Sequence, residues 1–254
     1  MAIKNGQQVL AIPAYFYPAG ANLAYWEQLR TGYPSVRIAV ATGLGLEGNQ
    51  PNPDYQTQIT KTRKIGIQTL AYVTTSSGSK PSAQVRREID NAYAWYGPDG
   101  IFFDEAVAYP VIPAQVGYYR TLHRYVKAKV GGRRAVTVLN HGQILPEEYV
   151  SVCDILLNAE MSYDSYVKGE WKPWGWESRY PATKFWHLVH SVDTIAKMQE
   201  VVRLSRVRNA HYVFVTSATM KSSGGPYGSL PPAPYWRAEM KEITSGQPPS
   251  RPWP

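Results

Sequence analysis

The sequence has 254 residues, 44% of them hydrophobic, with eight Trp, 19 Tyr, one Cys and a formal net charge of +8. The single Cys excludes an internal disulfide framework, and no run of about 18 apolar residues is present to span a membrane. The positive charge is spread along the chain and is not interleaved with aromatic residues, so the pattern does not indicate a nucleic-acid-binding module.

Eight short runs rich in apolar and β-branched residues follow one another along the chain. Most begin roughly 20–35 residues apart, which is the spacing expected when a crossover helix follows each parallel strand. We therefore predict eight strands, at residues 9–17, 36–42, 69–75, 100–105, 135–140, 154–160, 184–191 and 211–217.

Helical periodicity fills most of the gaps between these runs. The clearest case is 85–96, where apolar residues repeat on one helix face and Gly97-Pro98 stops the helix. Asp193 is a candidate N-cap for a helix over 195–202. Further helices are predicted near 23–29, 55–62, 118–126, 146–150 and 235–243, the one at 118–126 being ended by Gly131-Gly132.

Alternating strands and helices predict a single (β/α)8 barrel of the TIM type over residues 1–246. A doubly wound open sheet is the alternative. Against it, the first strand runs into Tyr17-Pro18-Ala19-Gly20, without a G-x-G-x-x-G motif or a phosphate-binding loop. Residues 247–254 hold four prolines and are predicted to form an extended tail.

In such barrels the catalytic side chains lie at the carboxyl ends of the strands. Here those ends carry three carboxylates, Asp104 and Glu105 after the fourth strand and Glu160 at the sixth. Taken singly, each polar residue at a strand end is also explained as a helix cap or an ion-pair partner. The other candidates at these ends are Tyr15, Tyr17, Thr42, Thr74, Thr75, Asn140, His141, His187 or His190, Thr216 and Ser217.

Carboxylates from two different strand ends indicate a particular chemistry. Asp104 or Glu105 would face Glu160 across a cleft, and two carboxyl groups that flank a bond suit glycoside hydrolysis. Side chains alternate along a strand, so only one of Asp104 and Glu105 is expected to face the substrate. His187 and His190 are three residues apart and are expected to face opposite sides, so no zinc pair is predicted there.

A dense aromatic segment follows the sixth strand, outside any helical period. It holds Tyr163, Tyr166, Trp171, Trp174 and Trp176. Sugar rings pack their C–H faces on aromatic planes, so one prediction is that this loop lines a groove beside the carboxylates. The alternative is a self-packed loop that covers the barrel mouth.

Four segments at these strand ends carry a resemblance to a known family. They are Ile12-Pro13-Ala14-Tyr15-Phe16-Tyr17-Pro18, Ala71-Tyr72-Val73-Thr74-Thr75, Gly100-Ile101-Phe102-Phe103-Asp104-Glu105 and Asn140-His141-Gly142. In this order they resemble the spherulation-specific family 4 (spherulin-4-like) proteins over nearly the whole chain. Where that family often has Asn-Pro-Gly after the fifth strand, this chain has Asn140-His141-Gly142.

The resemblance implies an endo-acting (β/α)8 glycoside hydrolase, similar to the polygalactosaminidases. Such enzymes cut α-1,4-linked N-acetylgalactosamine or galactosamine-containing exopolysaccharide of microbial biofilms. The family's acidic pair matches Asp104 and Glu105, and its later glutamate matches Glu160. We expect Asp104 to be the nucleophile or electrostatic stabiliser, Glu160 the general acid/base and Glu105 a residue that tunes Asp104, without a metal or cofactor.

A set of polar and aromatic residues is expected to bind the polysaccharide beside these carboxylates: Tyr15, Tyr17, Thr75, Asn140, His141, Tyr163, Trp171, Trp174, His187 and Thr216. The alternative function is a carbohydrate-binding barrel without catalysis. We expect a monomer with no nucleic-acid or membrane partner. The resemblance implies a secreted or cell-surface protein, although residues 1–6 lack the apolar core of a signal peptide.

Overall fold

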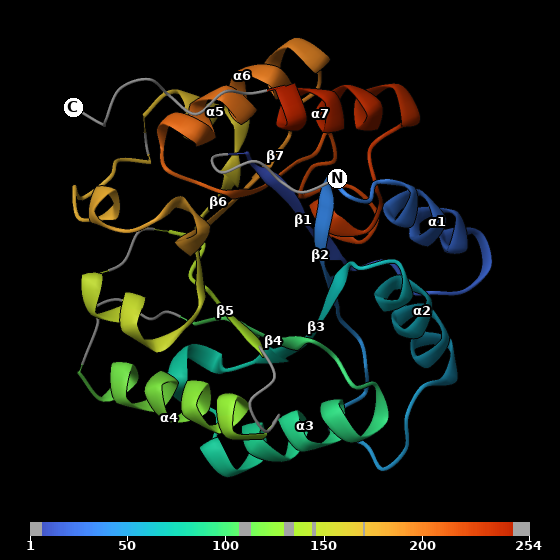
Figure 1. The fold of residues 1–254 in the computed structure, drawn as a ribbon, viewed down its shortest axis with the longest axis vertical. Helices are drawn as coiled ribbons and strands as arrows, with labels where there is room; N and C mark the ends of the chain where they lie inside the picture. The colour runs from blue at the N-terminus through green and yellow to red at the C-terminus, as the bar shows by residue number, and fades with distance from the viewer. Residues whose placement is uncertain (1–6, 107–112, 130–134, 144–145, 170, 246–254) are drawn as a thin grey trace.

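The fold is a closed barrel of parallel strands in chain order, with helices packed around it (Figure 1). The computed structural model describes residues 7–106, 113–129, 135–143, 146–169 and 171–245. Strand β8 pairs with β1 and closes the ring, which confirms the predicted (β/α)8 barrel. The strands are β1 (Val9–Ala14), β2 (Val36–Ala41), β3 (Gln68–Thr74), β4 (Gly100–Asp104), β5 (Val136–Asn140), β6 (Ile155–Ser162), β7 (Phe185–His190) and β8 (Tyr212–Val215).

Helices lie at the predicted places between the strands. They are α1 (Leu23–Thr31), α2 (Pro53–Lys64), α3 (Ser82–Trp95), α4 (Pro113–Lys129), α6 (Ile195–Val207) and α7 (Ala233–Ser245), and the predicted segment near 146–150 is the 3-10 helix η3 (Glu147–Val152). The short helix α5 (Tyr163–Val167) was not predicted and lies in the aromatic segment that was expected to be a loop. None of the helices in the described part of the chain combines the length and the apolarity that a membrane span needs. The predicted Gly131-Gly132 stop and the tail 247–254 lie outside the described residues.

The start of α6 differs from the prediction in one residue. Asp193 was the expected N-cap, but the side chain of Thr194 accepts the backbone N–H of Lys197 at 3.2 Å. Asp193 forms an ion pair with the Lys197 ammonium at 2.9 Å instead. A threonine hydroxyl caps the first turn of a helix almost as well as a carboxylate does. Asp193, one residue earlier, reaches the Lys197 ammonium in that turn.

Aromatic side chains fill the centre of the barrel below its mouth. The Phe102 ring stacks on Tyr72 at 6.0 Å between centroids and meets Trp186 edge-on at 5.7 Å. Gly100 starts β4 because a Cβ there would lie 1.9 Å from a carbonyl oxygen of β5. Side chains alternate along a strand, so Phe102 inside the barrel places Asp104 inside as well, at the carboxyl end of β4.

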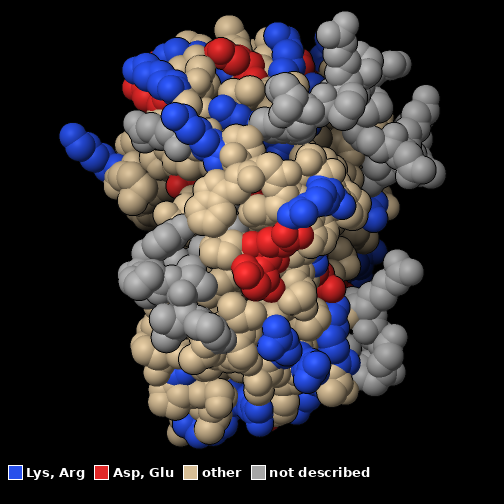
Figure 2. Space-filling model, turned by 90° about the vertical axis from the view of Figure 1, so that its left-hand side faces the viewer, with Lys and Arg blue, Asp and Glu red and all other residues tan. Residues whose placement is uncertain are grey.

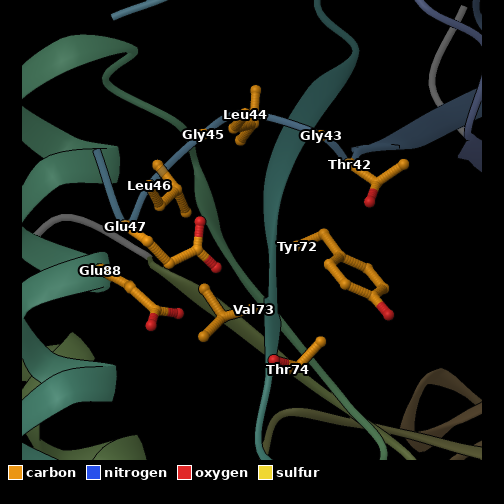
Figure 3. A pocket seen from close by; sticks show the side chains of 10 residues that line it. All are labelled: Thr42, Gly43, Leu44, Gly45, Leu46, Glu47, Tyr72, Val73, Thr74 and Glu88. Carbon is orange, nitrogen blue, oxygen red and sulfur yellow. The ribbon is translucent and has the colours of Figure 1, made fainter. Parts of the chain in front are cut away.

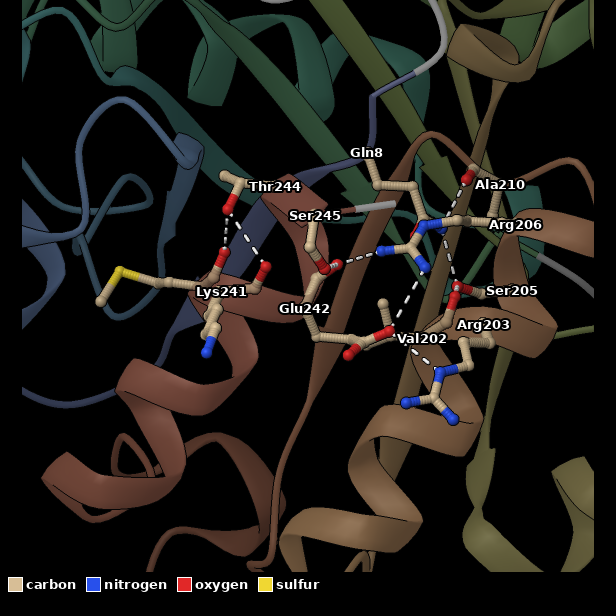
Figure 4. Close-up of polar contacts among 11 residues, drawn as sticks. Gln8, Val202, Arg203, Ser205, Arg206, Ala210, Lys241, Glu242, Thr244 and Ser245 are labelled. Atoms are coloured by element: carbon tan, nitrogen blue, oxygen red, sulfur yellow. Dashed lines mark hydrogen bonds and ion pairs between the residues drawn. The ribbon is translucent and has the colours of Figure 1, made fainter. Parts of the chain in front are cut away.

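Ion pairs join the last two helices, α6 and α7, and a hydrogen bond joins α6 to the residue before β1 (Figure 4). Arg203 Nε and Arg206 Nη1 lie 3.1 and 3.5 Å from Glu242 Oε1, which links α6 to α7. Gln8, just before β1, donates a hydrogen bond to Ser205 Oγ of α6 at 2.8 Å. These contacts support the β1–β8 junction, where the barrel closes.

Helix α7 also buries a carboxyl group under the barrel wall. Glu239 has no exposed surface, and its Oε1 accepts the backbone N–H of Val215 at 2.8 Å. Burial raises the pKa of Glu239 to about 8, and the hydrogen bond from Val215 opposes this only in part. Glu239 therefore holds a proton in the folded protein at neutral pH.

Candidate active site

Adjacent strands β4, β5 and β6 bring two carboxylates and an amide together at one mouth of the barrel. Asn140 Nδ2 donates to Asp104 Oδ1 at 2.7 Å and to Glu160 Oε2 at 2.9 Å. The backbone N–H of Gly142 donates to Asn140 Oδ1 at 2.9 Å and so fixes the orientation of the amide. Asn140 thus bridges the two carboxylates that come from different strand ends.

The shared amide limits how far apart the two carboxylates lie. The same nitrogen is 2.7 Å from Asp104 Oδ1 and 2.9 Å from Glu160 Oε2, so these oxygens are separated by at most about 5.6 Å, the sum of the two distances. Retaining glycosidases hold their carboxyl groups about 5–5.5 Å apart, and inverting ones about 6.5–9.5 Å apart. The facing oxygens are therefore close enough for the two carboxyl groups to act on one bond.

Three tyrosines surround the carboxylate pair. Tyr72 Oη donates to Asp104 Oδ2 at 2.5 Å. The Tyr15 ring packs edge-on against Tyr72 at 5.6 Å and against Tyr227 at 5.7 Å between centroids. The Tyr227 hydroxyl, from the β8–α7 loop, is buried beside Glu160, and burial together with the contact with Glu160 raises the pKa of Tyr227. Phenol rings and hydroxyls therefore line the space around the carboxylates.

Burial sets the protonation of these groups. It raises the pKa of Glu160, and the negative charge of Asp104 adds to this increase while the hydrogen bond from Asn140 opposes it. Burial together with the neighbouring Asp104 also raises the pKa of Tyr15 and Tyr72. The phenols therefore remain hydrogen-bond donors, and Glu160 keeps its proton to a higher pH than an ordinary glutamate.

Asp104 rather than Glu105 faces the cleft. Glu105 has a φ of +53°, a left-handed backbone conformation that is uncommon outside glycine, and its side chain is exposed. The Glu105 carbonyl accepts the backbone N–H of Ser77 at 2.7 Å, which ties the turn after β4 to the turn after β3. Glu105 therefore lies at the rim, where its charge still acts on Tyr72.

Thr75 and Thr216, predicted as sugar contacts, are buried instead. Thr75 Oγ1 donates to the carbonyl of Asp104 at 2.8 Å and pairs with the Tyr119 hydroxyl at 2.9 Å. Thr216 Oγ1 accepts the backbone N–H of Ala218 at 3.1 Å. Both hydroxyls thus stabilise turns at the ends of β3 and β8 and leave no exposed surface to a substrate.

Strand alternation separates the histidines near the mouth. Trp186 points into the barrel, so His187 points outward, where its Nδ1 pairs with the Tyr166 hydroxyl at 2.7 Å. His190, three residues on, lies on the opposite face, half-buried at the mouth. His141 is buried between tyrosines of α4 and η3, and burial holds its pKa well below the usual value. His190, not His187, is therefore the histidine of β7 that reaches the mouth.

The tryptophan-rich segment packs on the flank of the barrel and does not form the predicted groove beside the carboxylates. Trp171 packs on the outward-facing His187 at 5.1 Å, and its Nε1 donates to the carbonyl of Asn158 at 2.9 Å. Trp176 packs on Phe185, the first residue of β7, at 5.8 Å. Helix α5 has only five residues, so this loop covers the outer face that a longer crossover helix would cover.

Three other predicted aromatic contacts lie at the periphery. The Tyr17 hydroxyl donates to Asp54 Oδ2 at 2.8 Å on the rim of the mouth. The Tyr163 hydroxyl donates to Glu200 Oε2 at 2.6 Å and so packs against α6. Trp174 is 53% exposed and follows the buried Trp171 in the same segment. Of the predicted contacts, Tyr15 and Asn140 are the ones that the structure brings to the carboxylate pair.

Sequence reasoning missed Tyr72 and Tyr227 as site residues. Alternation would have found Tyr72, because Thr74 pairs with Asp104 across β3 and β4 and Tyr72 lies two residues earlier on the same face. Tyr227 belongs to a loop that follows Gly224-Gly225-Pro226, and no periodicity there indicates which way its side chain points.

Neither a metal site nor a continuous basic surface is found among the described residues on the flank shown in Figure 2. Within the described residues, no three His, Cys, Asp or Glu side chains are grouped so that they could hold a metal ion. Figure 2 shows Lys and Arg in separate groups on one flank, with a compact acidic patch between them. A protein that tracks phosphates presents a continuous basic surface, and this flank does not form one.

Comparison with known sequences places the chain in a family. The model of the spherulation-specific family 4 matches residues 9–243. Spherulin-4 of Physarum polycephalum is 28% identical over 167 residues, which are 63% of this chain and 48% of the Physarum protein. The match therefore spans about half the length of that relative.

Two solved structures share the barrel. Aspergillus clavatus Sph3 in complex with GalNAc has a TM-score of 0.79 at 21% identity, covering 96% of this chain and 100% of that one. A chitinase from Chromobacterium violaceum has a TM-score of 0.60 at 13% identity, covering 95% of this chain and 100% of that one. At these identities the likeness establishes the fold alone, and the chemistry has to be argued from the site.

Proposed function

The chain belongs to the spherulation-specific family 4, and we propose that it is a glycoside hydrolase. Its proposed substrate is α-1,4-linked N-acetylgalactosamine or galactosamine-containing exopolysaccharide, cut within the chain. The observation that carries the proposal is the pair Asp104 and Glu160, held by one amide at a spacing suited to a glycosidic bond. The Aspergillus clavatus structure with GalNAc supports an amino-sugar ligand.

In the proposed reaction Glu160 is the general acid and Asp104 the nucleophile. Glu160 gives its proton to the leaving glycosidic oxygen while Asp104 attacks the anomeric carbon, forming a covalent glycosyl-enzyme. Glu160 then takes a proton from the water that releases the sugar, and the configuration is retained. The raised pKa of Glu160 suits the first step, and the hydrogen bond from Tyr72 holds Asp104 in position.

The remaining parts of the proposal follow from the same arrangement. Glu105, exposed at the rim, acts on the pair through its charge and does not touch the anomeric carbon. Two carboxyl groups supply both the proton and the nucleophile, so these steps use no metal or cofactor. An enzyme with this substrate works outside the cell or at its surface, and we propose that location and a monomeric state.

The test is a reducing-end assay on galactosamine-containing polysaccharides with paired variants. Glu160→Gln keeps the shape of the side chain, so the fold should persist while turnover falls by about 10²–10⁴, the usual share of general acid–base catalysis. Asp104→Asn should lose at least as much. Glu27→Gln makes the same exchange at an exposed position on α1 and should change nothing. A Glu160→Gln variant with wild-type turnover would remove Glu160 from the mechanism.

The same assay separates the proposal from its alternative. A barrel that binds these polysaccharides with no turnover on any of them would be a carbohydrate-binding protein that has lost catalysis. The stereochemistry of the product is a further check. Proton NMR of the first product should show the same anomeric configuration as the cleaved bond in the substrate. Release of the opposite anomer would mean that Asp104 activates a water rather than attacking.

A further inference from the structure

A cavity of about 220 Å³ lies at the ends of β2 and β3 (Figure 3), and Thr74 in its wall pairs with Asp104 across β3 and β4. Its walls are the loop 42–47 after β2, the residues Tyr72 and Thr74 at the end of β3, and Glu88 of α3. Tyr72 lines this cavity and also donates its hydroxyl to Asp104 at 2.5 Å. Tyr72 therefore links the wall of this cavity to Asp104.

The loop wall is held in place by α3. The carbonyl of Leu44 accepts the Tyr96 hydroxyl at 2.7 Å, and the carbonyl of Leu46 accepts Asn91 Nδ2 at 2.8 Å. Both leucines are buried, while Glu47 remains exposed. These hydrogen bonds fix the loop before a ligand binds. Binding therefore costs less conformational entropy than it would with a flexible loop.

The charges around the cavity do not cancel. Glu88 is buried and pairs with the Lys80 ammonium at 2.7 Å, and the same ammonium donates to Thr74 Oγ1 at 3.1 Å. Glu47 has no hydrogen bond or ion pair among the described residues, and Figure 3 shows its carboxylate pointing into the cavity. One uncompensated negative charge thus faces this space, on a chain whose net charge is +8.

We propose that this cavity is a second sugar subsite and that the Glu47 carboxylate binds the free ammonium group of a deacetylated amino-sugar unit. The proposal rests on the glycosidase function proposed above, because it places that unit next to the one held at Asp104 and Glu160. An ionised carboxylate is a hydrogen-bond acceptor only, so it pairs with an ammonium group and is repelled by anionic substituents. An N-acetyl group carries no charge and gains less from Glu47.

Binding, rather than turnover, is the measurement that tests this subsite. In the Glu160→Gln protein, in which cleavage is expected to be slow, isothermal titration would compare a galactosamine oligomer with its fully N-acetylated counterpart of equal length. The free-amine oligomer should bind up to about five-fold tighter, the upper range for a solvent-accessible ion pair. Adding the Glu47→Gln substitution should abolish that preference. The remote Glu27→Gln exchange should leave it intact.

The ionic strength provides a second criterion. The preference should shrink as salt rises from about 0.05 to about 0.5 M, because exposed charge pairs are screened over a few ångströms at high salt. Equal affinity for the two oligomers in the Glu160→Gln protein, a preference that survives Glu47→Gln, or binding of neither oligomer would overturn the proposal. Failure of the glycosidase proposal would appear differently, as absent turnover in the wild type with the binding preference unchanged.

Discussion

Replacing Asn140 with alanine tests the bridge between the two carboxylates. The substitution removes the hydrogen bonds to Asp104 at 2.7 Å and Glu160 at 2.9 Å, and leaves the N–H of Gly142 without its acceptor. A hydrogen bond to a charged group contributes about 1.5–3 kcal/mol, and about 1.4 kcal/mol is tenfold in rate. If one such bond is needed in the transition state, kcat/KM should fall roughly 10- to 100-fold.

The pH profile separates this role from a loss of stability. The bond from Asn140 lowers the pKa of Glu160, so its removal should raise that pKa further above the ordinary value. In the proposed mechanism Glu160 acts in its protonated form, and the alkaline limb of kcat/KM reports the free enzyme's acid, so this limb should move to higher pH. The assay is reducing-end release between about pH 4 and pH 9. An alkaline limb that stays at the wild-type pH would refute the reasoning, whatever the rate.

Asn209 provides the matched control. Its Nδ2 also donates two hydrogen bonds, to the carbonyls of Glu177 and Tyr180 at 3.0 and 2.9 Å, far along the chain from the carboxylates. Its φ is +61°, so alanine there is strained as well as short of hydrogen bonds. Asn209→Ala should therefore lower the melting temperature at least as much as Asn140→Ala, yet keep the wild-type pH profile.

Three further predictions concern the supporting structure. The folded-state pKa of Glu239, about 8, exceeds that of an unfolded glutamate, so the contribution of this group to stability is complete below the unfolded pKa and is lost as pH rises through about 8. Glu239→Gln should reduce the decrease of the melting temperature with rising pH. The same decrease in the variant and the wild type would contradict the prediction. Trp171→Ala should cost about 3–5 kcal/mol in denaturant unfolding, whereas exposed Trp174→Ala should cost little; equal costs would contradict the packing described. Thr75→Val should destabilise by about 1–3 kcal/mol without changing KM for polysaccharide, and a selective rise in KM would restore Thr75 as a sugar contact.

The strands were predictable because their signal is local. Each run is rich in apolar and β-branched residues, and each of the eight predicted runs overlaps a strand of the barrel. The carboxyl end of each strand then followed from the fold, which is how Asp104 and Glu160 could be brought to one mouth before any coordinates were known. Alternation along β7 places His190 on the same face as Trp186. Alternation along β3 places Tyr72 on the same face as Thr74, which pairs with Asp104.

The aromatic loop was misjudged for a physical reason. Composition indicates that tryptophans are present, but a loop has no period that states which surface they cover. The deciding feature is the length of α5, five residues, which leaves the flank of β6 and β7 without a full crossover helix. Trp171 and Trp176 pack on that flank, on His187 and Phe185, because a barrel strand must be covered on its outer face.

The fixed amide also determines where the acid's proton lies. Gly142 holds Asn140 Oδ1, so the NH2 group and not the carbonyl of Asn140 faces both carboxylates. Glu160 Oε2 is then a hydrogen-bond acceptor, and in the proposed mechanism Oε1 is the oxygen better placed to carry the proton. Asp104 accepts on both oxygens, from Asn140 and Tyr72, which suits the proposed role of nucleophile. In the proposed mechanism one amide thus orients the proton donor and the nucleophile together, and a flipped or missing amide would remove both orientations.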